Sequence, residues 1–515
     1  MNSSTPGITA PSRPYSVRIA RWWARLVWNH RTGLALVCLI SLLTLYYQWE
    51  NWRSARELKA AHQRLVERLG TDDMLAFASP TIPDEQNYFV LPVITQWATG
   101  ELSKGSPFRR YVVPQDAFWP KNLRKPPIIG NEADGTSWLD WTTWLANRNL
   151  KGETPAVALN RELGEANGLL TQLAAGLGRP FACFKPSFRE AVETAGENRS
   201  DTDIPDIRRI NDNQQDLCLH LRCAAAAGDE VKARQVALIS LRLFAESAAA
   251  HGTLVISLQS LACHGIAFKA LQDALGHAVW DEASLHALQM QLTKINDLRM
   301  MEHAMCANTL WSFAIGIGIR NKRDMDLFNQ VYVYNAGHRT SSLSNGVFNG
   351  AYAYGPAGWH DANLAFFIDG QLDAIGPEGE TNLMSVDGRY ASFRERLKNE
   401  FPGNPRRMLA AMISPQIGSV FTFAAKSLFH RRCLIIACAL ERHRMVHGSF
   451  PTTLEVVEDE LKLFAVNDPA RPAQRPGYRL ETNGYLLWSA GENLQDDGGQ
   501  EEKDWLWRMK LASKL

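Results

Sequence analysis

Acidic residues are absent from the first 49 positions of this 515-residue chain, and the common catalytic signatures are absent from all of it. The sequence contains no G-x-x-x-x-G-K-[ST], no H-E-x-x-H, no G-x-S-x-G and no G-x-G-x-x-G that opens a helix. It therefore gives no support for a P-loop, a zinc-protease helix, a nucleophile elbow or a dinucleotide-binding turn. No C-x-x-C occurs, so thioredoxin-like and zinc-ribbon chemistry have no support either. The net charge of +1 gives no reason to expect a nucleic-acid partner.

The N-terminal segment, residues 1–32, is basic, because its arginines have no acid beside them before Glu50. Residues 33–49 then carry no charge, and tryptophan or tyrosine residues flank them on both sides. This length is at the short end of what a bilayer core of about 30 Å requires, and the aromatic flanks match the interfacial belts of a spanning helix. The sequence therefore predicts a single transmembrane helix over 33–49, with residues 1–32 in the cytoplasm and the bulk of the chain outside it.

Two other interpretations of residues 33–49 exist. A cleaved signal peptide needs small residues at its cut site, whereas this run ends in YYQWENW. A buried core helix rarely has such a charge asymmetry. An uncleaved signal-anchor in a bacterial inner membrane, with a periplasmic bulk, is therefore expected. The cysteines of that bulk are expected to be mostly buried small hydrophobes, because Cys218/Cys223 and Cys433/Cys438 are spaced wrongly for local disulfides on a helix.

Behind the anchor the sequence predicts a mainly α-helical protein. Residues 50–135 are expected to form a stalk helix and an extended loop region, and residues 136–415 a body of helical hairpins or a short bundle. The break at Gly228-Asp229 fits a short connection between antiparallel helices, with Asp229 as the N-cap. Residues 321–390 lose the helical period and are rich in glycine and asparagine, so surface loops are expected there.

Two groups of side chains have metal-ligand spacing. His443 and His447 are four residues apart and could share one helix face as ligands, although the flanking arginines and a following glycine favour a solvated helix end. Glu302, His303 and Cys306 form a second group, and the methionines around them favour a buried polar cluster whose groups are satisfied internally.

A third group lies in the predicted loops and gives the one enzymatic alternative. Asp361, Asp369 and Asp373 stand there beside His360, and loops often carry catalytic residues. An envelope hydrolase that uses Asp361 or Asp369 with His360 is therefore the alternative. A solvated loop explains the same residues without any activity, and no catalytic residue is predicted.

The stretch GYLLWSAGENLQDDGG near the C-terminus passes from an apolar strand into a loop of acids, an amide and glycines. Asn483-Gly484, at the start of this stretch, predicts a hairpin that pairs 478–480 with 485–488. The side-chain oxygens of this region are hard ligands, and the glycines free backbone carbonyls to turn inward, as in a calcium site. Calcium is thus a candidate cofactor, and an acidic turn closed by backbone N–H groups is the alternative. The predicted ligands are Asn493, Asp496, Asp497 and Asp504.

Residues 434–507 resemble the periplasmic part of type II secretion pseudopilins. The matching pieces are LIIACALERHRMVHGSFPTTLEVV, YRLETNGYLLWSAGENLQDDGG and DWLW. The resemblance implies that 416–515 form a pseudopilin-like α+β domain, a long helix that ends at a glycine–aromatic–proline step and is followed by a small antiparallel sheet. It also implies a loop after that sheet that binds calcium, as in the major pseudopilin. The family's usual D-P-W/F-G segment is reduced here to NDPARPAQRPGYRL, which keeps Asp468, Pro469 and Tyr478.

The whole chain also resembles a group of uncharacterised membrane-anchored proteins from bacteria of the Planctomycetes–Verrucomicrobia type. The pieces that carry this resemblance are YYQWENWR, IPDEQNYF, GWHDANL and the ERHRMVHGSFP…SAGENLQDDGG…DWLW ending. It implies topology and architecture but no activity. Together the patterns favour a non-enzymatic envelope protein, a scaffold, recognition or secretion-related component, whose expected partners are the membrane and envelope or secretion-system proteins.

Overall fold

The computed structural model describes residues 15–77, 82–94, 118, 152–182, 207–243, 254–322, 355–377, 382–400, 404–414 and 420–511. Some sequence predictions lie outside these residues. They are most of the extended loop at 101–135, the predicted helix around 138–145, Cys183, the break at 251–252 and the stretch 323–354 of the predicted loops.

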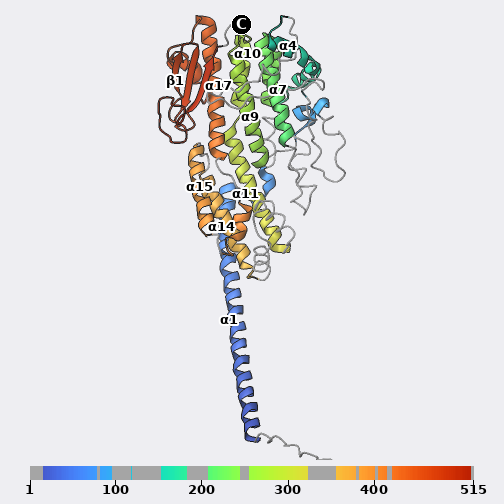
Figure 1. Ribbon diagram of the computed structural model, residues 1–515, viewed down its shortest axis with the longest axis vertical. Helices are drawn as coiled ribbons and strands as arrows, with labels where there is room; N and C mark the ends of the chain where they lie inside the picture. The colour runs from blue at the N-terminus through green and yellow to red at the C-terminus, as the bar shows by residue number, and fades with distance from the viewer. Residues whose placement is uncertain are drawn as a thin grey trace, which may run out of the picture.

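The N-terminal helix α1 (Tyr15–Leu69) is one continuous helix of 55 residues, about 80 Å long at 1.5 Å per residue. Its lower part projects from the body as a rod (Figure 1). The large apolar side chains from Leu34 to Leu45 are exposed, whereas Glu50, Ala61 and Leu65 on its upper part are buried. The predicted stalk residues 50–69 are helical, as expected, and their buried side chains pack into the body.

The helix α1 packs against α14 (Gly358–Ile375). The next helix along the chain is α15 (Leu383–Glu400), which packs against α14. The prediction of surface loops over 321–390 is therefore wrong for residues 358–375 and 383–390, which are helical. Most of α14 is buried, so it has no polar face and gives no amphipathic period in the sequence. Gly370 lets α15 approach closely, since a β-carbon there would lie 1.9 Å from the ring of Phe393.

The body is a bundle of antiparallel helices, as the sequence predicts. The break at Gly228-Asp229 is confirmed: Gly228 has a φ of 75°, and the Asp229 side chain caps the next helix by accepting from the Lys232 N–H at 3.2 Å. The remaining body elements are η1 (Met74–Phe77), η2 (Asp84–Gln86), η3 (Tyr88–Val90), α4 (Pro155–Glu162), η4 (Leu163–Ala166), α5 (Asn167–Ala175), α7 (Ile207–Ala227), α8 (Glu230–Arg242), α9 (Leu254–Leu275), α10 (Glu282–Lys294), α11 (Asp297–Lys322) and α16 (Met408–Ile413).

The long C-terminal helix α17 (Val420–His447) is confirmed, but it lies inside the bundle. It packs against α9, α10 and α15, and its stretch Cys433–Leu440 is buried throughout. The helix of the predicted domain 416–515 is therefore part of the common core. The six described cysteines of the body are buried and free, as expected: Cys218, Cys223, Cys263, Cys306, Cys433 and Cys438.

A small antiparallel sheet follows α17 after the short helices η6 (Leu454–Val457) and α18 (Glu458–Leu461). Its strands are β1 (Gly477–Glu481), β2 (Gly484–Ser489) and β3 (Trp505–Lys510), in the order β1-β2-β3. The hairpin prediction is confirmed, since Tyr478 pairs with Leu487 and Leu480 with Tyr485. Gln272 on α9 donates to the carbonyl of Arg508 at 2.8 Å, which ties the sheet to the bundle.

Candidate functional site

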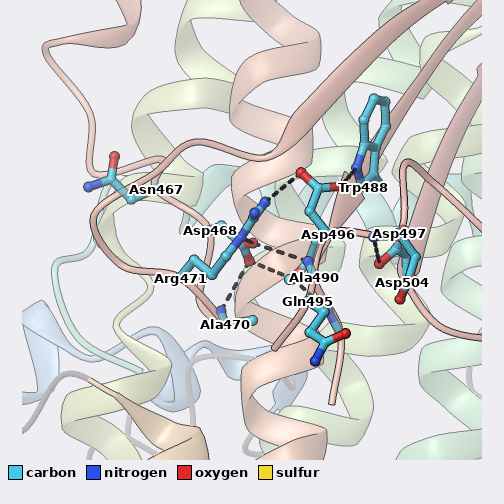
Figure 2. A network of polar contacts seen from close by, with 12 residues as sticks. Asn467, Asp468, Ala470, Arg471, Trp488, Ala490, Gln495, Asp496, Asp497 and Asp504 are labelled. Carbon is cyan, nitrogen blue, oxygen red and sulfur yellow. Dashed lines mark hydrogen bonds and ion pairs between the residues drawn. The ribbon is translucent and has the colours of Figure 1, made fainter. Parts of the chain in front are cut away.

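The segment before β1 that holds Asp468 and Arg471 meets the end of β2 and the acidic loop that follows it (Figure 2). Asp468 lies between these two parts of the chain. Asp468 is fully buried. Its carboxylate accepts from the backbone N–H groups of Ala470 at 3.0 Å and Ala490 at 3.2 Å, and from the Ser489 hydroxyl. A buried carboxylate is stable only when its lone pairs are satisfied. Asp468 therefore holds the segment before β1 to the end of β2.

Arg471 extends this network to the acidic loop. Its Nε lies 3.4 Å from Asp468 Oδ2, and its Nη2 donates to Asp496 Oδ2 at 3.1 Å. The other Asp496 oxygen accepts from Trp488 Nε1 at 2.8 Å and the Gly498 N–H at 3.0 Å. The Trp488 hydrogen bond, the Gly498 N–H and the Arg471 charge together outweigh partial burial and lower the pKa of Asp496. One guanidinium thus bridges a buried carboxylate and a loop carboxylate.

Asp504 closes the far end of the loop from just before β3. This residue is 4% exposed, and its Oδ2 accepts from the N–H groups of Gly499 at 2.7 Å and Gln500 at 3.1 Å. Its Oδ1 accepts from the Asp497 N–H at 3.3 Å. Gly498 and Gly499 have φ values of 74° and 80°, a left-handed conformation that turns these amides inward and favours glycine.

Asp497, the remaining acidic member of the predicted ligand set, is paired within the loop. It accepts from Asn493 Nδ2 at 2.8 Å and from Lys503 Nζ at 3.2 Å. The Asn493 hydrogen bond and the Lys503 charge lower the pKa of Asp497. Asn493 Oδ1 accepts in turn from the Gln495 N–H at 3.1 Å, so it is also engaged locally.

The structure thus brings the four predicted calcium ligands into one loop, but their oxygens point to protein N–H groups. Within the described ranges no group of three or more His, Cys, Asp or Glu side chains could hold a metal ion. Arg471 and Lys503 supply the positive charge that a cation would supply. The geometry supports the acidic turn closed by backbone N–H groups, and calcium binding stays a prediction that requires these contacts to be exchanged.

The residues proposed for a hydrolase do not lie in loops. His360 and Asp361 are buried in the first turn of α14. Asp369 accepts from Arg64 on α1 at 2.6 Å and 2.8 Å, so its carboxylate is part of the contact between these two helices. The third acid, Asp373, is solvated, with a side chain 68% exposed that lies 3.8 Å from Arg396.

A cavity of about 20 Å³ lies in the body, enough for a single water molecule. It does not reach His360, Asp361 or Asp369. Only Glu302 of the predicted polar group faces it, and this carboxylate lies 3.6 Å from Arg68 Nη2. The lining residues are Leu298, Glu302, Met305, Ile375, Leu383, Val386 and Phe421.

No protein-family model, curated protein or solved structure matches the chain. What the fold and site define is a mainly helical protein with a small antiparallel sheet near its C-terminus. Among the described residues, α1 is the one helix long and apolar enough to cross a membrane, and its apolar window is not buried in the body.

Proposed function

We propose that this chain is a single-pass, membrane-anchored protein of the bacterial envelope that acts as a scaffold or recognition component. The observation that carries the proposal is the change along α1 at Glu50. The large apolar side chains from Leu34 to Leu45, before this residue, are exposed, and after it one face of the helix is buried against α14. An exposed apolar helix of this length is stable in a bilayer and costly in water.

The body is joined to α1 directly above the apolar run. Asn51 Oδ1 accepts from the Gly358 N–H at 2.6 Å, and Arg406 donates to both Glu50 and Glu57, the latter at 2.6 Å. Arg64 and Asp369 add a bidentate pair farther up the helix. These contacts would hold the body upright at a fixed distance from the bilayer, which suits a protein that presents a surface to partners.

The orientation rests on the charge of the N-terminus. The arginines before residue 32 and the absence of acids favour a cytoplasmic N-terminus, with the body in the periplasm. The pseudopilin likeness of the last hundred residues supports a link to secretion. Entry of α17 into a pilus has no support, because its apolar surface is already buried by the protein's own helices.

Two measurements test this function in the native bacterium. Under alkaline carbonate extraction the full chain should stay in the membrane pellet, and Leu39→Arg/Leu42→Arg should release it, because a charge at the bilayer centre costs about 2.5–3.5 kcal/mol. In a deletion strain, His360→Gln and Asp361→Asn should complement as well as the parent if they are folded. Loss of complementation by a folded His360 or Asp361 variant would favour the hydrolase instead.

A further inference from the structure

The side of α1 that is turned away from the body carries aromatic and basic residues where its uncharged run ends. Their spacing of three and four residues places them on one helix face. The buried residues Ser54 and Ala61 lie on another face, which packs into the body. We call the exposed group the Trp–Arg stripe, and its members are Trp49, Trp52, Arg53 and Arg56.

Each arginine of the stripe lies over the ring of the tryptophan four residues before it. The guanidinium carbon of Arg53 is 5.4 Å from the centre of the Trp49 ring, and that of Arg56 is 4.8 Å from the Trp52 ring. The two rings are 50% and 58% exposed, so they cover no core. Helical side chains lean toward the helix N-terminus, which is the side of the apolar run. The stacking therefore brings both charges down toward that run.

Both arginines have donors left for an anion. Arg53 donates from Nε to Glu57 at 2.9 Å, which leaves its Nη groups for another acceptor. No described acid forms an ion pair with Arg56, whose charge is balanced by nothing but the face of the Trp52 ring. The planar fork of a guanidinium matches the oxygens of a phosphate group. The stripe thus presents two phosphate-binding groups beside two apolar rings.

The height of the stripe matches the headgroup layer of a bilayer. At 1.5 Å per residue, Arg53 lies about 6 Å and Arg56 about 10 Å beyond Trp49. The headgroup layer on each side of a bilayer is about 5–8 Å thick, and a long arginine side chain that leans back reaches it. An interfacial aromatic belt accounts for the tryptophans, and a solvated helix face accounts for the arginines. Neither explanation accounts for the stacking of one on the other.

We propose that the Trp–Arg stripe binds the phosphate group of an anionic phospholipid in the leaflet on the side of the body. This inference rests on the proposed function, because it needs α1 in a bilayer. A lipid fits because the stripe continues the exposed apolar side chains from Leu34 to Leu45, so one ligand meets both the apolar and the charged part. Glu57 accepts from Arg53 and also from Arg406 of the body at 2.6 Å. A bound headgroup would thus be linked to the body and would brace it against the membrane surface.

The test is native mass spectrometry of the full-length protein in neutral detergent micelles, titrated with phosphatidylglycerol and with phosphatidylcholine. We expect phosphatidylglycerol to bind more tightly. Arg53→Gln and Arg56→Gln should each weaken its binding about fivefold and should change phosphatidylcholine binding much less. Arg53→Lys/Arg56→Lys should keep most of the affinity, because the charge remains. Lys462→Gln removes an exposed cation elsewhere and should change nothing.

A charge-matched pair separates the stripe from the basic N-terminus. Arg25→Gln/Arg31→Gln removes two exposed arginines on the other side of the apolar run. Combined with Arg53→Gln/Arg56→Gln, it should lose the sum of the two effects, because the two ends contact different lipids. Excess inorganic phosphate should not displace the lipid, since it lacks the acyl chains.

Three results would overturn the inference. Arg53→Gln/Arg56→Gln could bind phosphatidylglycerol as tightly as the parent, or the combined variant could lose no more than Arg25→Gln/Arg31→Gln does. Displacement of the lipid by inorganic phosphate would make the stripe a site for the free ion. Failure of the proposed function is distinguishable from all three, because alkaline carbonate would then release the parent itself from the membrane.

Discussion

Gly358 of α14 lies directly against the backbone of Glu50 on α1. A β-carbon at position 358 would come within 2.6 Å of the Glu50 carbonyl oxygen and 2.8 Å of the Asn51 Cα. The two helices meet here with the Gly358 backbone against the Glu50 backbone, at the level where the exposed apolar part of α1 ends. This contact sets how close the body sits to the apolar segment.

Gly358→Ala should therefore force the two helices apart. We expect the free energy of unfolding to fall by about 1–3 kcal/mol, as for other overpacked sites, measured by thermal unfolding in detergent. Gly388→Ala on α15 is the matched control, since nothing lies within 4 Å of a β-carbon there. In a helix interior that change should stabilise by about 0.5–1 kcal/mol. Equal effects of the two substitutions would contradict the close contact.

Arg406 should be essential for the contact between α1 and the body. Glu50 is 2% exposed and pairs with Arg406, so Arg406→Leu leaves a buried carboxylate without its cation. We expect a loss of about 3–5 kcal/mol of stability. Arg406→Leu/Glu50→Leu should recover most of it, because the unpaired charge is then gone. If the double variant is as unstable as the sum of the single variants, the pair does not act as a unit.

The acidic loop should behave as a turn with internal cations. The thermal midpoint of the full chain should be the same in calcium and in chelator, whereas a bound ion at a hundredfold excess over its Kd would add about 2.7 kcal/mol. Arg471→Ala should lower the midpoint in both buffers, because Asp496 loses its ion pair and Asp468 a donor. Lys462→Ala is the control, because it removes an exposed cation that pairs with Asp459 outside the loop. A calcium-dependent midpoint in the parent would establish the metal site instead.

The hairpin, α17 and the Gly228-Asp229 break are predictable because their signals are local. Asn483-Gly484 defines a turn by itself, and α17 shows a long helical pattern. The helix α14 is not predictable in the same way, since a helix buried on most sides gives no period. Its polar residues then look like those of a loop.

The candidate site is predictable only in part, for a different reason. The loop acids are visible as a cluster, but their partners are not. Asp468 lies 21 residues from Ser489, and Arg471 lies 25 from Asp496, so only the fold brings them together. The sequence indicates the importance of Asp468 only through the Asp468-Pro469 pair, which matches the pseudopilin-like segment. The residues that join α1 to α14 lie about three hundred positions apart in the sequence, so no local pattern predicts their contact.

Acid should destabilise the body through His220. Burial lowers the pKa of His220 to about 4, and the nearby Lys232 charge lowers it further. The hydrogen bond to the Phe118 carbonyl at 2.7 Å acts in the opposite direction but is outweighed. An unfolded histidine titrates near 6.5, so between these values the unfolded chain binds more protons and stability falls as the pH falls. At pH 5 the loss should be about 2 kcal/mol. His430 on α17, whose pKa burial also lowers to about 4, adds a similar loss. His220→Gln should therefore reduce the fall in stability between pH 7 and 5 by about 2 kcal/mol without removing it, and substitution of the exposed His286 on α10, His286→Gln, should leave it unchanged.

The central claim is that α1 crosses the membrane once and places the body outside the cytoplasm. Two reporters fused after Leu515 test it most directly: a phosphatase that is active only outside the cytoplasm, and a fluorescent protein that matures only inside it. The charge bias of the N-terminus predicts phosphatase activity without fluorescence, and Arg18→Glu/Arg21→Glu/Arg25→Glu should reduce that activity. Fluorescence without phosphatase activity in the parent fusion would contradict the account.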